Sequence, residues 1–326
     1  MKNPVEEISL LLQTDMDAVN TIILQRMDSH VPLVNQLAGY LIAAGGKRIR
    51  PLLTLASTAI HNGDMSRAHL LAACVEFIHT ATLLHDDVVD ESDERRGQAT
   101  ANEVFGNQAS VLVGDFLFSR SFQMMVDDGN LDILRILSDA SAIIAQGEVL
   151  QLSSANNIET SMDDYMAIIK AKTAALFAAA CEVGPVIAGG HTGQAEAMAE
   201  YGLNLGIAFQ IVDDVLDYSA NQKKLGKTVG DDFREGKITA PVLYALEKAD
   251  AEEQEFWTRV INANQKNDDD LDHAIALMRK HKALEQSMGL AQDYADKALE
   301  SISIAPDGEL KDLLKALIKF TINREY

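Results

Sequence analysis

Residues 64–90 read DMSRAHLLAACVEFIHTATLLHDDVVD, and this stretch decides the fold class. Apolar residues recur in it at intervals of three and four, which is the period of a helix, and they cover most of its faces. No proline occurs in it, or anywhere between Pro51 and Pro185. Because proline breaks helices, its absence over this interval favours helix. We therefore expect a long, largely buried helix that ends in three carboxylates.

The same spacing of apolar residues continues along most of the chain. It covers residues 5–29, 64–90, 108–126, 131–152, 161–182 and 195–219, and continues more weakly to the end. No run of alternating Val, Ile and Thr predicts a sheet, and no Ser/Gly-rich linker divides the chain. We expect an all-α fold, a single helical bundle in one domain over residues 1–326. The break at 220–241 is too long for a routine helix connection and predicts a functional loop.

The composition limits the kinds of partner. Of 326 residues, 28 are Lys or Arg and 49 are Asp or Glu, which gives a formal net charge of −21. Nucleic acid is therefore excluded as the main partner, because binding phosphates along a nucleic acid needs a basic surface. Apolar residues make up 47% of the chain, enough for a large buried core.

The cysteines and the apolar segments indicate a cytoplasmic protein. Cys74 and Cys181 lie in apolar runs without CxxC spacing, which suits a reducing compartment. The first residues carry acids where a signal peptide needs basic residues, so no secretion is expected. Residues 174–190 are the most apolar segment, but Glu182 and Pro185 interrupt them, so we expect no transmembrane segment. A peripheral contact with lipid stays open.

Three segments match the pattern Asp-Asp-x-x-Asp: residues 86–90, 213–217 and 268–272. The third follows an Asn-rich stretch and has the pattern of an acidic first turn of a helix, so we interpret it as structural. The first two follow apolar helical stretches. Positions i and i+4 share one face of a helix, so Asp86 lies on the same face as Asp90, and Asp213 on the same face as Asp217.

Like charges one helical turn apart are costly unless a cation binds them. Carboxylate oxygens that leave room for water and phosphate suit Mg²⁺ better than Zn²⁺. For one motif alone, a solvated acidic helix end is the better interpretation. Two such motifs, each after an apolar helix, favour a magnesium site.

The basic residues of this acidic chain are clustered. They gather in Gly45-Gly46-Lys47-Arg48-Ile49-Arg50-Pro51, in Arg95-Arg96-Gly97, at Lys170 and Lys172, and at Lys227 and Lys237. Arg and Lys beside Mg²⁺ form the usual set of groups that hold a diphosphate. The two glycines in the first cluster let the backbone approach a ligand closely. We therefore expect a diphosphate-binding site.

These motifs together resemble the trans-polyprenyl diphosphate synthases, and most closely the bacterial octaprenyl diphosphate synthases. The resemblance rests on GGKRIRP at 45–51, HTATLLHDDVVD at 79–90 with Arg95-Arg96-Gly97, Lys172-Thr173, and FQIVDDVLD at 209–217. Five motifs in the same order make it specific, and it runs from about Leu37 to Tyr244 and more weakly beyond.

The resemblance implies an isoprenoid synthase fold, a homodimer, and two acidic helix ends that face each other across a deep central cavity. It implies that isopentenyl diphosphate is bound by Lys47, Arg50, His79 and Arg96. It implies that the allylic diphosphate is bound by Arg95, Lys172, Thr173, Gln210, Lys227 and Lys237. It implies Mg²⁺ ligation by Asp86, Asp90 and Asp213, with Asp87, Asp214 and Asp217 as ligands or as their supports. The catalytic candidates are then Asp86, Asp90, Asp213, Lys172 and Arg95.

The implied reaction is sequential head-to-tail addition of isopentenyl diphosphate to an allylic diphosphate, with farnesyl diphosphate as the expected primer. Ala81 and Thr82 lie five and four residues before Asp86, about one turn or 5.4 Å from the metal site. In the family, bulky aromatic residues at these positions give short products. Ala81 and Thr82 therefore predict a long product, which by likeness has eight units and serves quinone side chains. Close helix packing is an equally good reason for either small residue.

Two other classes of function remain as alternatives. An HD-type metal phosphohydrolase would use His61, His85, Asp86 and a later Asp, but it leaves the motif at 213–217 and the clustered Lys and Arg residues unexplained. A non-enzymatic helical partner subunit would not need both acidic motifs intact. A terpene cyclase is excluded by the second Asp-Asp-x-x-Asp motif and by the basic residues expected to bind isopentenyl diphosphate.

Overall fold

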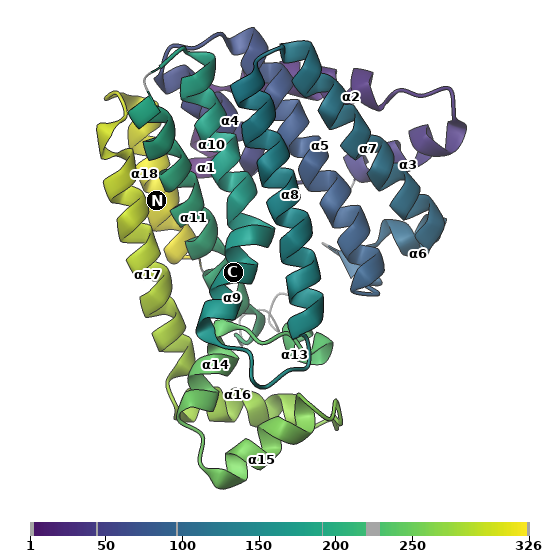
Figure 1. The fold of residues 1–326 in the computed structure, drawn as a ribbon, viewed down its shortest axis with the longest axis vertical. Helices are drawn as coiled ribbons and strands as arrows, with labels where there is room; N and C mark the ends of the chain where they lie inside the picture. Colours follow the sequence, from purple (N-terminus) through teal and green to yellow (C-terminus); the bar gives the residue numbers. More distant parts are fainter. Residues whose placement is uncertain (1–2, 44, 96, 191, 220–228, 325–326) are drawn as a thin grey trace. The chain divides into compact units, whose positions relative to one another are not determined.

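The computed structural model is almost entirely helical, which confirms the predicted all-α class (Figure 1). It describes residues 3–43, 45–95, 97–190, 192–219 and 229–324. In these ranges the only strands are β1 (Glu94–Arg95) and β2 (Gln98–Ala99). They form a short antiparallel hairpin in which Glu94 lies opposite Ala99.

The chain forms two compact units. Unit 1 comprises Met1–Ser141, Leu176–Gly202 and Ile302–Leu317, and unit 2 comprises Ala142–Ala175, Leu203–Ser301 and Ile318–Tyr326. The division falls within α8 (Leu131–Ser154), after the first residue of α10 (Ala175–Ile187), and within α11 (Thr192–Asp217) and α18 (Glu309–Ile322). A single domain over residues 1–326 stays a prediction.

Unit 1 is built around two long helices. Its elements are α1 (Pro4–Leu11), α2 (Gln13–Met27), α3 (Pro32–Ala43), α4 (Ile49–Ile60), α5 (Met65–Val89), β1, β2, α6 (Ala101–Phe105), α7 (Asn107–Asp128), most of α10 (Ala175–Ile187), the 3₁₀ turn Ile302–Ile304 and the first parts of α8, α11 and α18. Helices α5 and α7 pack side by side (Figure 1). The Cys74 thiol donates to the Ser121 carbonyl at 3.3 Å, and the Ser110 hydroxyl donates to the Leu84 carbonyl at 3.2 Å.

Helix α5 is the helix expected at 64–90. The Asp64 side chain caps its first turn by accepting from the Ser66 backbone N–H at 2.9 Å. Its last residue is Val89, with Asp90 as its C-cap, and the following Glu91 has φ 51°, a left-handed conformation that stops the helix. Among the described helices, α5 alone has the length and apolar character needed to cross a membrane, but 61% of that apolar window is buried inside the protein. That degree of burial is typical of a core helix.

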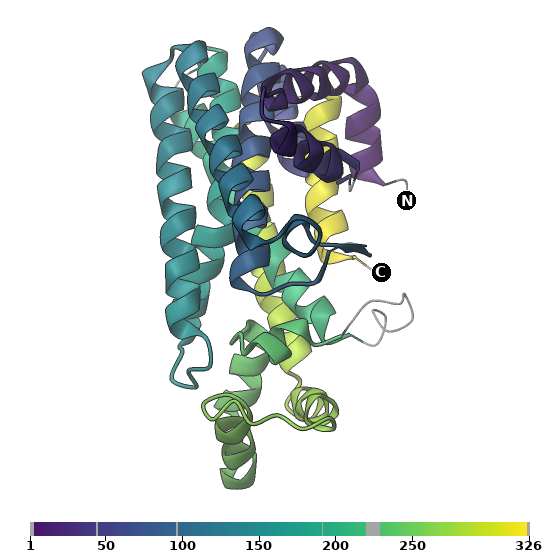
Figure 2. The ribbon, with the colours of Figure 1, turned by 90° about the vertical axis from the view of Figure 1, so that its right-hand side faces the viewer.

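Unit 2 carries the second acidic motif. Its elements are α9 (Met162–Ile169), a π-helix (Lys170–Ala174), α13 (Asp231–Glu235), α14 (Ala240–Glu247), α15 (Ala251–Val260), α16 (Asp270–Lys280), α17 (Ala283–Ser301) and the remaining parts of α8, α11 and α18. Helices α14, α15 and α16 are the green helices at the bottom of Figure 2. They enclose a core that includes the fully buried Trp257, Val260 and Met278.

Two details of unit 2 bear on the sequence analysis. The expected loop at 220–241 contains the short helix α13, while residues 220–228 lie outside the described residues. The third acidic motif begins α16, and Asp270 accepts two hydrogen bonds from Arg259 at 2.7 and 2.8 Å. The structural interpretation of residues 268–272 agrees with this position.

Candidate active site

The first acidic motif forms the end of α5. Asp86 and Asp90 are half-buried and lie one turn apart, with the Asp90 N–H donating to the Asp86 carbonyl at 2.7 Å. Asp87 differs, because it is only 4% exposed. Its Oδ1 accepts from Nε and Nη2 of Arg95 at 2.8 and 2.7 Å. The β1–β2 hairpin therefore places Arg95 on the buried carboxylate of the motif.

A cleft of about 820 Å³, counting its open mouth, lies beside this motif in unit 1. Its polar lining consists of Tyr40, Arg48, Glu76, His79, Thr80, Asp87, Arg95, Gln98 and Thr100, with Gly45 at its edge. Arg48 and Glu76 form an ion pair at 2.5 Å. The Tyr40 hydroxyl donates to the Ala99 carbonyl of the hairpin. This cleft brings two predicted substrate ligands, His79 and Arg95, to one place.

Two other residues predicted to bind isopentenyl diphosphate, Arg50 and Lys47, lie at or just before the start of α4. Arg50, in the first turn of α4, contacts His79 with 3.1 Å between Nη1 and Nε2, and its guanidinium lies 4.5 Å from the centre of the Phe177 ring. Because arginine only donates, His79 Nε2 is the acceptor in this contact. Lys47 is exposed in the turn before α4. Arg96 lies outside the described residues.

The second acidic motif forms the end of α11 in unit 2. The Asp213 side chain is 57% exposed, and its Oδ1 lies 4.0 Å from Nη1 of Arg324. The Arg324 side chain is buried and stacks on the Phe209 ring at 4.2 Å from its centre. A residue near the end of the chain thus contacts the motif, although no sequence pattern marked it.

Asp214 is the buried carboxyl of this motif. It accepts from the Tyr165 hydroxyl at 2.6 Å and from the Gln210 amide at 2.8 Å. Burial raises the pKa of Asp214 to about 7, against the lowering effect of these two hydrogen bonds. The Thr173 hydroxyl donates to the Gln210 side-chain oxygen at 2.8 Å, so a chain of hydrogen bonds links Thr173 to Asp214.

The Asp217 side chain binds the backbone at the start of α13. Its side chain accepts from the backbone N–H groups of Asp231 and Asp232 at 3.2 and 3.1 Å, and its carbonyl accepts from Gly230. Burial raises the pKa of Asp217 to about 6. Burial and the neighbouring Asp214 also raise the pKa of Asp232 well above its ordinary value. The sequence left the role of residues 231 and 232 open, and the structure adds them to this acidic group.

A second cleft, in unit 2, collects most of the residues expected to bind the allylic diphosphate. It measures about 630 Å³ with its open mouth. Its polar lining consists of Gln151, Ser154, Thr160, Tyr165, Lys172, Thr173, Gln210, Asp214, Asp232, Lys237 and Thr239. Lys172 pairs with Glu148 at 2.8 Å, and Lys237 pairs with Glu235. Lys227 lies outside the described residues.

The donor set fits a hard divalent cation. Among the described residues, no three His, Cys, Asp or Glu side chains form a group that could hold a metal ion by themselves. Asp86, Asp90 and Asp213 present carboxylate oxygens at helix ends that are at least partly open to solvent. Mg²⁺ is usually bound through one or two carboxylates together with substrate phosphates. Their chemistry fits such an ion.

Ala81 is fully buried, and the Thr82 hydroxyl donates to the His79 carbonyl at 2.8 Å. Ala81 lies seven residues after Cys74 and four before His85, so it shares their face of α5. Cys74 and His85 both contact α7. The packing interpretation of Ala81 therefore gains weight, and its role in product length stays a prediction.

The comparisons with known proteins agree on one family. The model of the polyprenyl synthetase family matches residues 31–278. The chain is similar to the octaprenyl diphosphate synthase of Haemophilus influenzae, with 46% identity over 99% of this chain and 98% of the relative. A decaprenyl diphosphate synthase structure from Rhodobacter capsulatus is similar at a TM-score of 0.94 and 50% identity, over 98% of this chain and 100% of the other.

A polyprenyl synthase from Caulobacter crescentus, whose structure holds calcium and isoprenyl diphosphate, matches at a TM-score of 0.94 and 47% identity, over 98% of each chain. These likenesses confirm the isoprenoid synthase fold that the motifs implied. The family is one whose members depend on divalent metal ions. The chain belongs to the polyprenyl synthetase family and is a prenyltransferase.

Proposed function

We propose that this chain catalyses Mg²⁺-dependent, sequential head-to-tail addition of isopentenyl diphosphate to an allylic diphosphate. The observation that carries the proposal is the cleft of unit 2, where Lys172, Thr173, Gln210 and Lys237 line one cavity with Asp214. Hydroxyl, amide and ammonium groups that donate hydrogen bonds, placed beside the aspartates at the end of α11, are suited to a metal-bound diphosphate.

The reaction starts when the allylic diphosphate leaves as an anion and a resonance-stabilised carbocation remains. Positive charge that is already in place lowers this barrier, because negative charge develops on the leaving group. Lys172, Lys237 and Arg95 supply that charge and orient the diphosphate. Bound magnesium supplies further charge neutralisation at the departing oxygens, and the residues that would hold it are Asp86, Asp90 and Asp213.

Isopentenyl diphosphate occupies the cleft of unit 1, which His79 lines. Arg50 contacts His79, and Lys47 is exposed in the turn before α4. The alkene of isopentenyl diphosphate attacks the carbocation, and a proton is lost to the released diphosphate. Water must be kept from the cation, and we assign this role to the 220–241 segment. The Arg50–His79 contact fixes the ring, so the donor arrangement is set before substrate binds.

We propose a long product with eight isoprene units for quinone side chains, farnesyl diphosphate as primer, and a cytoplasmic homodimer that touches membrane only peripherally. The relative from H. influenzae is named for an octaprenyl product and the one from R. capsulatus for a decaprenyl product. This chain is thus about equally similar in sequence to two relatives named for products of different length, and we propose that a few side chains set that length.

The test is direct. The protein is incubated with farnesyl diphosphate, labelled isopentenyl diphosphate and Mg²⁺, and the lipid is extracted into butanol. We expect butanol-soluble label that disappears with EDTA, and chromatography of the dephosphorylated product gives its length. Label that remains in the aqueous phase at all metal concentrations contradicts the proposal.

The phosphohydrolase alternative gains no support from the residues it needs. His61 contacts the Ser57 carbonyl at 2.8 Å through Nδ1, and His85 contacts the Val111 carbonyl at 3.2 Å. Both histidines thus contact helix backbone. The comparisons likewise favour a synthase over a non-enzymatic partner subunit.

A further inference from the structure

The cation Lys172 lies on an unusual piece of backbone. Residues Lys170–Ala174 form a π-helix between α9 and α10, and the Ala175 N–H donates to the Lys170 carbonyl five residues back. A π-turn contains one residue more than an α-helical turn and often marks a functional site. The turn carries two neighbouring residues of the unit 2 cleft, Lys172 and Thr173.

Helix α8 supports this turn at Gly147. A Cβ atom built on Gly147 would lie 2.7 Å from the Ala171 Cβ and 2.9 Å from the Lys172 backbone nitrogen. Only a glycine therefore allows α8 to approach the π-turn so closely. This contact fixes the backbone of Lys172 against α8.

The next residue of α8 fixes the other end of the same side chain. Glu148 Oε2 lies 2.8 Å from Lys172 Nζ, and the two side chains are 26% and 22% exposed. Thr173 points to a different neighbour, because its hydroxyl donates to Gln210. The π-turn thus directs consecutive side chains to α8 and to α11.

We propose that Glu148 is a positioning residue that holds the Lys172 ammonium in place to receive the allylic diphosphate, an inference that rests on the proposed function. A flexible lysine side chain loses rotamer entropy when it binds a phosphate oxygen, and the ion pair with Glu148 removes part of that freedom before the substrate binds.

A competing role for Glu148 predicts the opposite effect on diphosphate binding, and this contrast makes the proposal testable. A carboxylate beside a diphosphate also repels it, and a carboxylate that merely competes for Lys172 would weaken substrate binding. Replacing Glu148 with glutamine removes the charge but keeps the shape. A positioning role predicts weaker diphosphate binding in Glu148→Gln, whereas a competing role predicts tighter binding.

The experiment compares Glu148→Gln, Lys172→Gln and the double variant with the wild type. We expect Glu148→Gln to raise the KM for farnesyl diphosphate and the Kd for inorganic pyrophosphate with Mg²⁺ about tenfold, as befits one charged hydrogen bond. The KM for isopentenyl diphosphate should change by less than about twofold. In the Lys172→Gln background, Glu148→Gln should have no further effect, because the group it positions is gone.

Two further variants separate positioning from folding. Asp139→Asn replaces an exposed acid of the same helix with its amide and should leave all constants unchanged. Glu148→Asp keeps the charge and should recover part of the lost affinity. Tighter pyrophosphate binding in Glu148→Gln, or an equal effect with and without Lys172, overturns the proposal. A wild-type protein that makes no labelled lipid refutes the proposed function instead, while the pyrophosphate titration still tests Glu148.

Discussion

The two acidic motifs have the same pattern of aspartates but different electrostatics. In residues 86–90 the buried carboxylate, Asp87, is paired with the guanidinium of Arg95. In residues 213–217 the buried carboxyl, Asp214, accepts from the neutral groups of Tyr165 and Gln210, and burial raises its pKa to about 7. The buried second aspartate therefore has a charged partner in unit 1 and neutral partners in unit 2.

We expect the largest loss of activity from removal of Asp86 or Asp213, the partly exposed first aspartate of each motif, which we call the outward carboxylates. At these positions the two motifs are expected to act alike. We expect Asp86→Ala and Asp213→Ala each to lower kcat about 10³-fold or more, because each removes a proposed metal ligand next to the leaving group. The measurement is steady-state kinetics with labelled isopentenyl diphosphate, with thermal unfolding as a check on folding.

Asp272→Ala is the matched control, since it removes an exposed aspartate from the third Asp-Asp-x-x-Asp segment. It should leave kcat unchanged. If only one of the two outward variants loses activity, the motifs are not equivalent in function, and a site built from both is wrong.

The next difference concerns the turn before each motif. Four and five residues before Asp86 lie Thr82 and Ala81, whereas the same positions before Asp213 hold Phe209 and Ala208. We expect Ala81→Phe to shorten the product by one or more isoprene units while Ala208→Val leaves its length unchanged. Chromatography of the dephosphorylated products measures this.

Ala81 is fully buried, so a phenylalanine there also overpacks the core, at a cost of roughly 1–3 kcal/mol. A lower Tm with an unchanged product would mean that Ala81 serves only the contact between α5 and α7. In that case the product length is set by other residues.

The helices and the clusters of Lys and Arg could be predicted from the sequence, because both depend only on residues close together in the chain. Apolar spacing at three and four defines α5 and α11 without knowledge of the rest of the chain. The supports of the aspartates could not be predicted in this way. The β1–β2 hairpin brings Arg95 to Asp87, and Tyr165 contacts Asp214 from a different helix. No spacing in the sequence therefore links either pair.

The buried aspartates themselves should respond differently to removal of their charge. Asp87→Asn leaves the Arg95 guanidinium without its carboxylate, and we expect it to cost about 2–3 kcal/mol of unfolding free energy, reduced by the partial exposure of Arg95. Asp214→Asn keeps an acceptor for one neutral donor and should cost about 1 kcal/mol. Urea unfolding at pH 7.5 without metal measures both values. Equal costs would mean that burial, and not the partner, determines the contribution of these groups.

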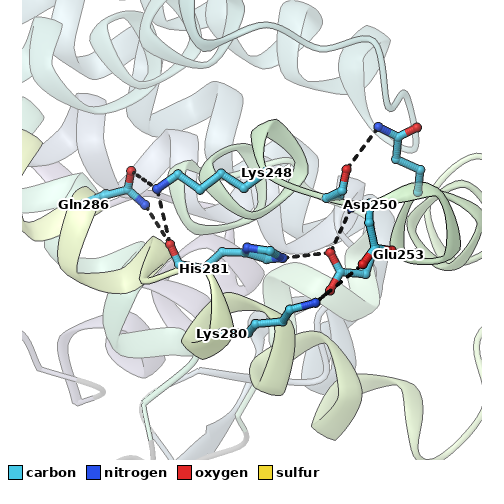
Figure 3. Close-up of polar contacts among 8 residues, drawn as sticks. Lys248, Asp250, Glu253, Lys280, His281 and Gln286 are labelled. Carbon is cyan, nitrogen blue, oxygen red and sulfur yellow. Dashed lines mark hydrogen bonds and ion pairs between the residues drawn. The ribbon is translucent and has the colours of Figure 1, made fainter.

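A third carboxylate separates burial from the type of partner. Glu253, in α15, is as buried as Asp214 but is paired with the Lys280 ammonium at 2.5 Å and hydrogen-bonded to His281 at 2.7 Å (Figure 3). The hydrogen bond from Lys280 is the main reason that its pKa falls to about 2. A carboxylate whose folded-state pKa is lowered stabilises the protein above its unfolded pKa of about 4.3, and this contribution is lost as the pH falls toward 2.

We therefore expect Glu253→Gln to cost only about 1–2 kcal/mol at pH 7, since Lys280 is half exposed. The variant should also lose part of the stability change between pH 4.5 and 2 that the wild type shows in urea unfolding. Glu252→Gln, which removes a neighbouring exposed acid, should keep the wild-type pH dependence. If both variants titrate alike, cation pairing does not explain the low pKa of Glu253, and the contrast drawn between Asp87 and Asp214 loses its physical basis.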